Sequence, residues 1–131
     1  MKLTDNFSKS EFNCKCGCEM PDDVLKNIKT LAVQLQVLRE RSNEPITINS
    51  AYRCKSHNHS IGGVSNSQHV LGKAADIVVR NFTPNEVANT IENMIRNEFN
   101  PNFIIGGLGR YNTFTHLDIR GYMARWDNRT K

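Results

Sequence analysis

The most regular hydrophobic pattern in the chain predicts a helix from Asp22 to Arg41. Apolar residues recur there at intervals of three and four, which places them on one side of a helix. A proline followed by two acidic residues, starting at Pro21, is a typical start signal because these residue types suit a first turn. The apolar positions are Val24, Leu25, Ile28, Leu31, Ala32, Leu35 and Leu38.

A second helix is predicted to begin after Thr83. The Thr83 hydroxyl can cap the helix, Pro84 suits its first position, and Glu86 completes a capping box. Pro101 lies beyond its end. The apolar residues expected to face the core are Val87, Ala88, Ile91, Met94 and Ile95.

Short runs rich in β-branched and apolar residues predict strands, and glycines between them predict turns. Because helices and strands do not alternate regularly, we expect an α+β fold with a small, mostly antiparallel sheet and two main helices. The predicted strands are Ile46 to Asn49, Ala74 to Val79, Phe103 to Ile105 and Thr115 to Ile119, and the predicted turns lie at Gly62-Gly63 and Gly106-Gly107-Leu108-Gly109. The glycine run at 106–109 is not a nucleotide-binding loop, because such a loop opens a helix and here the chain continues into a strand.

Length and composition add limits to this picture. The 131 residues suit one domain spanning 1–131. The net charge of +4 favours anionic partners, but Lys and Arg form no long run, which disfavours nucleic acid. No apolar segment is long enough to insert in a membrane, and the start of the chain lacks the apolar core of a signal peptide. We therefore expect synthesis in a cytoplasm.

Two histidines and an aspartate form the constellation with the clearest chemistry. His69, Asp76 and His116 are good zinc ligands, and three protein ligands leave a fourth position open for water. Gly72 would let the chain turn so that Asp76, in the next strand, faces His69. His116 and Asp118 are two residues apart and share one face of a strand. Ordinary buried or surface polar groups are the alternative that residue types alone leave open.

The order and context of these residues resemble the zinc D-alanyl-D-alanine carboxypeptidase family, which includes phage and bacterial peptidoglycan peptidases. The segment 67–76 has the form S-x-H-x-x-G-x-A-x-D, with Ser-Ala-Tyr-Arg at 50–53 upstream and His-Leu-Asp at 116–118 downstream. The resemblance covers nearly the whole chain and implies a fold like that of hedgehog and D-Ala-D-Ala peptidases. It also implies that His69, Asp76 and His116 bind one catalytic Zn²⁺ and that Arg53 faces the substrate.

The catalytic base is not assigned by this resemblance. Many relatives have an acidic residue three positions before the last histidine ligand, where this chain has Thr113. Asp118 is the best nearby candidate for a base, although it could instead orient a histidine ligand or pair with Arg53. Arg53 itself could hold a carboxylate or a developing oxyanion, or form a structural salt bridge.

Other polar residues near the motif have weaker assignments. Ser67 could bind substrate or fix its own loop through a backbone contact. Tyr111 could contact the peptide or serve in packing. The loop histidines His57 and His59 are expected to be solvated and receive no zinc role.

Four cysteines have no clear role in the sequence. Cys14, Cys16 and Cys18 alternate along the chain, and Cys54 lies far from them. Together they could hold a second, structural Zn²⁺, but C-x-C-x-C is not the usual C-x2-C spacing. Reduced thiols are the default expectation for cytoplasmic synthesis, and a disulfide from Cys54 to one of the other three, formed in an oxidising compartment, is the alternative.

These features give two functional hypotheses. The first is a monomeric zinc peptidase that cuts a peptide bond of the peptidoglycan stem, acting as a phage or prophage endolysin on the cell wall or periplasm after its release from the cytoplasm. The second is a catalytically impaired module that binds peptidoglycan in a phage tail or wall assembly, which Thr113 at the expected acid position supports.

Overall fold

A five-stranded sheet forms the centre of the fold. The computed structural model describes residues 1–97 and 106–130, and within them the strands follow the spatial order β1-β2-β4-β3-β5. Three neighbouring pairs are antiparallel, and only β3 and β5 are parallel. The predicted α+β class with a mostly antiparallel sheet is therefore confirmed. The strands are β1 (Ile46–Ser50), β2 (Ala74–Val79), β3 (Gly107–Arg110), β4 (Thr115–Asp118) and β5 (Ala124–Asp127).

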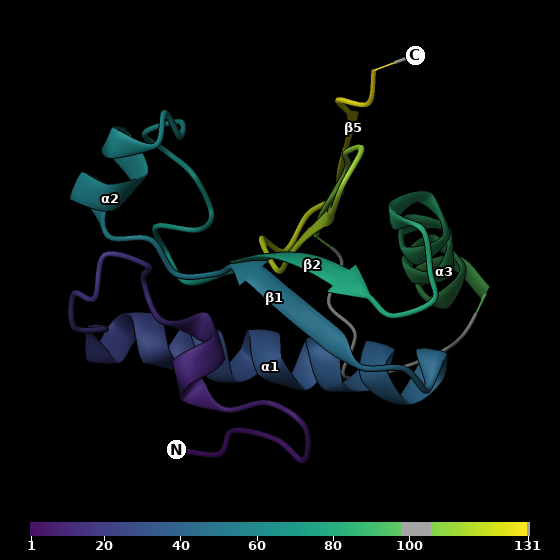
Figure 1. Cartoon of the computed structure of the whole chain (residues 1–131), viewed down its shortest axis with the longest axis horizontal. Coiled ribbons are helices and arrows are strands. Elements are labelled where there is room, and N and C mark those ends of the chain that lie inside the picture. The colour runs from purple at the N-terminus through teal and green to yellow at the C-terminus, as the bar shows by residue number, and fades with distance from the viewer. Residues whose placement is uncertain (98–105, 131) are drawn as a thin grey trace.

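Two long helices flank the strands, as the sequence predicts. Helix α1 (Asp22–Ser42) runs below β1 in Figure 1, and α3 (Pro84–Asn97) lies at the opposite end of the molecule from the short helix α2 (Lys55–Ser60). A single 3₁₀ turn, η1 (Lys9–Phe12), precedes α1. None of the helices in the described ranges is both long and apolar enough to cross a lipid bilayer.

The start of α3 shows the predicted capping box. The Thr83 hydroxyl accepts a hydrogen bond from the Glu86 N–H at 3.1 Å, and the Glu86 carboxylate accepts one from the Thr83 N–H at 2.8 Å. Each bond satisfies a backbone donor that the first turn of a helix leaves unpaired. The cap thus defines where the helix begins, and the helix packs against β2, β3 and β4.

The apolar faces of both helices form the core together with the inner face of the sheet. All the predicted core positions of α1 are buried except Leu25, which is partly buried, and the same holds for α3 apart from Ile95. The strands contribute buried residues that include Ile48, Ile77, Leu108 and Leu117. The two amphipathic helices thus pack their apolar sides against the sheet. The polar side chains of the strands are left to form the site described below.

Two strands were not predicted. The predicted turn at 106–109 is wrong, because Gly107 to Gly109 belong to β3, and β5 carries no alternating apolar pattern that would reveal it. Helix α2 was not predicted either, since it carries His57 and His59, which are predicted to lie in a loop. The other strand predictions are confirmed within one residue at each end, except for Phe103 to Ile105, which lies outside the described residues.

A steric constraint explains why residue 109, in β3, is a glycine. In the register of the sheet, Ser50, Asp76, His116, Gly109 and Trp126 pair in turn across all five strands. A Cβ atom on Gly109 would collide with the indole ring of Trp126. The missing side chain therefore lets Trp126 lean over β3 towards His116, whose ring centroid lies 4.9 Å away.

We expect Gly109→Ala to lower the free energy of unfolding by about 1 to 3 kcal/mol, because the added methyl overpacks the space under the indole. Urea denaturation followed by circular dichroism measures this loss. In a Trp126→Leu background the indole is gone, so the same substitution is expected to cost less than half as much. Equal costs in the two backgrounds would contradict this explanation of the glycine.

Candidate functional site

The structure brings together the three residues that the sequence predicts as metal ligands. His69 lies in the turn before β2, Asp76 on β2, and His116 directly opposite Asp76 on β4. The Asp76 Oδ1 atom is 3.3 Å from His69 Nε2 and 3.0 Å from His116 Nδ1. All three side chains are buried, and one ligand atom from each lies within 4.8 Å of the others.

These distances fit the dimensions of a zinc site. With zinc bonds of about 2.0 to 2.1 Å to nitrogen and oxygen, two ligands of a tetrahedral ion are roughly 3.3 to 3.4 Å apart. The distances from the Asp76 oxygen to the two nitrogens are close to this value. The donor set of two imidazoles and one carboxylate therefore suits Zn²⁺ with one position left for water or substrate.

The second ring nitrogen of each histidine is held by an oxygen. His69 Nδ1 donates to the Ala51 carbonyl at 2.7 Å, because a carbonyl can only accept. His116 Nε2 lies 2.7 Å from Asp118 Oδ2. Such outer contacts fix the orientation of a ligating imidazole and raise its basicity. They leave His69 Nε2 and His116 Nδ1 facing Asp76.

Asp118 shares a strand face with His116, as predicted, but its position argues against the role of catalytic base. It is fully buried, and its oxygens accept hydrogen bonds from the Gly107 and Arg120 N–H groups and from the Arg120 guanidinium at 2.7 to 3.2 Å. It lies behind His116 and does not line the cleft described below. These contacts fit the alternative in which Asp118 orients a histidine ligand. The alternative pairing with Arg53 is wrong, because Arg53 contacts Asp76 instead.

The electrostatics of the site follow from these contacts. Burial acts to raise the pKa of Asp76 and of Asp118, but hydrogen bonds from His116, supported by His69 at Asp76 and by Arg120 at Asp118, hold both values well below the usual range. Burial acts to lower the pKa of His116, but its two carboxylate partners outweigh this effect and raise it. In the absence of a metal ion, protonated His116 therefore provides part of the positive charge that balances the two buried carboxylates.

A cleft of about 410 Å³ opens over the three residues. Arg53 lines it, with a side chain that is 15% exposed, and also bonds to Ser50 Oγ at 3.1 Å, Asn58 Oδ1 at 3.3 Å and Asp76 Oδ2 at 3.3 Å. Arg53 thus forms the predicted salt bridge and also lines the cleft, while its contact with substrate stays a prediction. The lining residues are Arg53, Val64, Asn66, Ser67, Gln68, His69, Asp76, Tyr111, Phe114, His116, Arg120, Tyr122 and Trp126.

Ser67 and Tyr111 line the cleft and also make internal contacts. The Ser67 hydroxyl accepts a hydrogen bond from the His69 N–H at 3.2 Å, which is the local backbone contact expected as an alternative. The Tyr111 hydroxyl accepts a hydrogen bond from Trp126 Nε1 at 2.8 Å, and its ring stacks on Phe114 with centroids 4.3 Å apart. The structure thus ties both residues to the frame of the cleft.

Arg120 and Trp126 are cleft residues that the sequence analysis missed. The Arg120 guanidinium carbon lies 5.3 Å from the ring centroid of Trp126 and 5.6 Å from that of Tyr122. Arg120 could have been found because it follows Asp118 by two residues on an alternating strand pattern. Trp126 is the single tryptophan of the chain, but nothing in the sequence around it shows that it faces His116.

The comparison with protein families agrees with this geometry. A model of the peptidase M15 family matches residues 5–118, which includes all three candidate ligands. The chain belongs to the peptidase M15 family. The resemblance seen in the sequence is thereby confirmed. A zinc D-Ala-D-Ala carboxypeptidase of Streptomyces albus G is 42% identical over 79 residues, which cover 55% of this chain and 31% of the relative.

This M15 family member departs from the pattern of many relatives at Thr113, which is exposed and does not line the cleft. Within the described ranges, Asp76 is the only carboxylate among the residues that line the cleft. His57 and His59 lie on α2 and are not part of the cleft lining. No described side chain therefore takes the place of the acidic residue.

We expect Asp118→Asn to weaken zinc binding roughly 10- to 100-fold, because an amide cannot accept from all the donors that surround Asp118 and no longer holds His116. Competition with a coloured chelator measures the zinc affinity, and a thermal melt reports folding. Asp127→Asn is the matched control, since this exposed carboxylate pairs with Arg129 and does not line the cleft. If the variant keeps its zinc affinity and its stability but no longer hydrolyses a peptide substrate, the result would instead support Asp118 as the catalytic base.

The metal-free protein is expected to lose stability as the pH rises above about 6.5, the usual histidine pKa. The folded state binds the His116 proton more tightly than the unfolded state does, so this contribution is complete below pH 6.5 and disappears as the pH passes the raised pKa. The lowered pKa values of Asp76 and Asp118 act oppositely, and stability falls when the pH drops below about 4.

Urea denaturation of the chelator-treated protein between pH 3 and 9 tests both limbs of this profile. His59→Ala is the control, because His59 is exposed and does not line the cleft that holds Asp76 and His116. A flat free energy of unfolding between pH 6.5 and 9 would show that His116 is not stabilised in its charged form.

Proposed function

We propose that the protein is a zinc-dependent peptidase that cuts a peptide bond next to D-alanine in the peptidoglycan stem. The observation that carries this proposal is that three candidate zinc ligands meet in the lining of one cleft, which suits a zinc ion with a fourth position left for water or substrate. Membership of the M15 family supports the reaction type. The name of the Streptomyces relative supports the substrate class.

The residues of this chain divide the work in the proposed reaction. His69, Asp76 and His116 would hold the zinc ion, which lowers the pKa of a bound water towards about 7 and polarises a carbonyl. Arg53 places a guanidinium at the edge of the metal site, where it can hold a carboxylate of the substrate or a developing oxyanion. Asp118 would orient His116 from behind.

The substrate side of the cleft suits a short, anionic peptide. Arg53 and Arg120 both line it, and a stem peptide ends in a carboxylate that either guanidinium can bind through two hydrogen bonds. Phe114 and Trp126 offer apolar surface beside these charges. This combination supports binding of a peptide terminus with small apolar side chains, such as those of alanine.

We further propose a role as a phage or prophage endolysin that reaches the cell wall or periplasm after release from the cytoplasm and acts there as a monomer. The net charge of +4 supports this role, because bacterial walls are anionic. Electrostatic attraction of this kind raises the rate of encounter and weakens with added salt.

A second candidate is a module that binds peptidoglycan without cutting it. The observation in its favour is that the cleft lining contains no carboxylate besides Asp76 in the part of the chain that the structure describes. A metal site without a base could hold a stem peptide through zinc and Arg53 and release it unchanged.

Digestion of purified muropeptides, read by mass spectrometry, tests both candidates. We expect loss of D-alanine or cleavage within the stem, abolished by a chelator and restored by zinc. His116→Ala should remove the activity, whereas His59→Ala should retain it, because both replace a histidine but only the first touches the site.

The possible outcomes separate the two functions. Binding of peptidoglycan without any zinc-dependent product would favour the binding module. If the folded, zinc-loaded protein neither cuts nor binds muropeptides, both candidates are wrong.

A further inference from the structure

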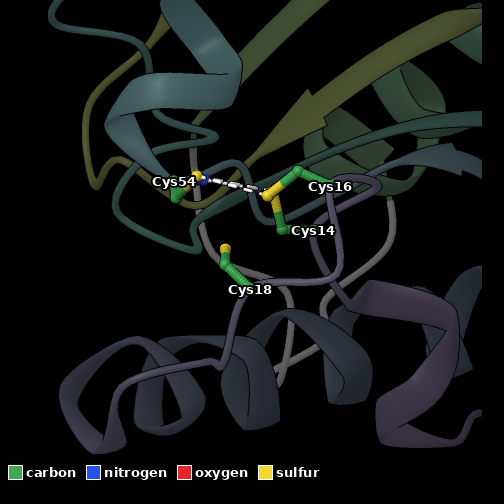
Figure 2. A group of neighbouring side chains, drawn as sticks. All are labelled: Cys14, Cys16, Cys18 and Cys54. Atoms are coloured by element: carbon green, nitrogen blue, oxygen red, sulfur yellow. Dashed lines mark hydrogen bonds between the residues drawn. The ribbon is translucent and has the colours of Figure 1, made fainter.

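Four cysteine side chains converge at a point away from the proposed metal site of the cleft. Cys14, Cys16 and Cys18 come from the segment between η1 and α1, and Cys54 directly precedes α2. Figure 2 shows their sulfur atoms turned towards one another. The four sulfur atoms all lie within 4.8 Å of one another, and none of these cysteines forms a disulfide.

We propose that these four residues bind a second Zn²⁺ ion with a structural role. The four ligands would fill every position of a tetrahedral ion, which leaves no place for water or substrate. The site would therefore stabilise the fold and take no direct part in the reaction of the cleft.

The distances between the sulfur atoms suit a shared metal ion. Cys14 Sγ lies 3.3 Å from Cys16 Sγ and 3.8 Å from Cys54 Sγ, and the sulfur atoms of Cys16 and Cys54 are 3.5 Å apart. With zinc–sulfur bonds of about 2.3 Å, tetrahedral ligands are roughly 3.8 Å apart. A disulfide would join only two of the four sulfurs at about 2.0 Å and would leave the other two unexplained.

The backbone around the cysteines supports thiolate ligands. The Cys54 N–H donates to Cys14 Sγ and the His57 N–H donates to Cys54 Sγ, both at 3.4 Å. Hydrogen bonds of this kind favour the charged form of a sulfur ligand. Gly17, at φ +84°, adopts a left-handed conformation in the turn closed by its N–H on the Cys14 carbonyl at 3.0 Å. This turn helps to bring the alternating cysteines to one point despite the unusual spacing.

Thiolate chemistry decides which ion the cluster would take. A dication with four thiolates has a net charge of −2; Lys15 and Lys55 directly follow two of the cysteines in the sequence, and Glu19 follows a third. Thiolate sulfur is a preferred ligand of zinc, and a site made only of sulfur excludes magnesium, calcium and manganese. The proposal therefore names Zn²⁺, and iron is the main competitor for this geometry.

The position of the cluster explains what an ion would stabilise. It joins the N-terminal segment to residues 50–54, where one backbone hydrogen bond, from the Tyr52 N–H to the Phe12 carbonyl at 3.0 Å, already runs between them. The same segment carries the Ala51 carbonyl that holds His69 and the Arg53 side chain in the cleft. An ion at the cysteines would thus anchor one wall of the cleft from outside.

Metal analysis of the full chain, purified under reducing conditions, tests the proposal without any assay of activity. We expect two zinc ions per chain in the parent protein. Cys16→Ser/Cys54→Ser should retain one ion, and His69→Ala, as the matched variant of the cleft, should also retain one. After replacement of zinc by Co²⁺, the near-ultraviolet absorption of cobalt–thiolate bonds should persist in His69→Ala and vanish in the cysteine variant.

The His69→Ala variant keeps the test decisive even if the cysteine variant fails to fold. A single zinc ion in the parent that is lost in His69→Ala would overturn the proposal. So would alkylation of only two thiols in a second sample that is purified without reductant and then denatured, because that result would reveal a disulfide. Iron in place of zinc would overturn the identity of the metal. Because no outcome depends on hydrolysis, the result stands apart from the fate of the proposed peptidase function.

Discussion

The burial of two carboxylates imposes the strongest physical constraint on this molecule. Asp76 and Asp118 lie in the sheet with little or no contact with water, and an unpaired charge there would be costly. His116 lies between them and contacts both, while Arg53 and Arg120 each pair with one of them. The site is therefore a compensated cluster of charges, in which a metal ion would take the place of the His116 proton.

The register of the sheet brings this cluster together. Because Asp76 on β2 lies directly opposite His116 on β4, a shift of one residue would turn one of the two side chains to the other face. Loops on either side then add His69 and Arg53. The helices hold the strands in place through apolar contacts and contribute no ligand, which leaves the polar face of the sheet free for chemistry.

The sequence predicts the long helices and brings out the three candidate ligands because these signals are local. Metal-binding residues of the right type at motif spacing, and apolar residues at helical spacing, can be recognised without knowing the partner strand. The sequence could not choose between the roles considered for Asp118, because the choice depends on Gly107 and Arg120 meeting its oxygens in three dimensions. Strand β3 could not be predicted either, because its glycines resemble a turn until Trp126 is seen to occupy the space above Gly109.

Two parts of the chain form the cleft, and only the first of them lies within the residues that match the family. The three candidate ligands and Arg53 fall within the matched residues 5–118, whereas Arg120, Tyr122 and Trp126 follow them and form another part of the wall. Substitutions in the later part can reshape the cleft without touching a ligand. The shape of the cleft and the set of candidate ligands can therefore change independently of each other.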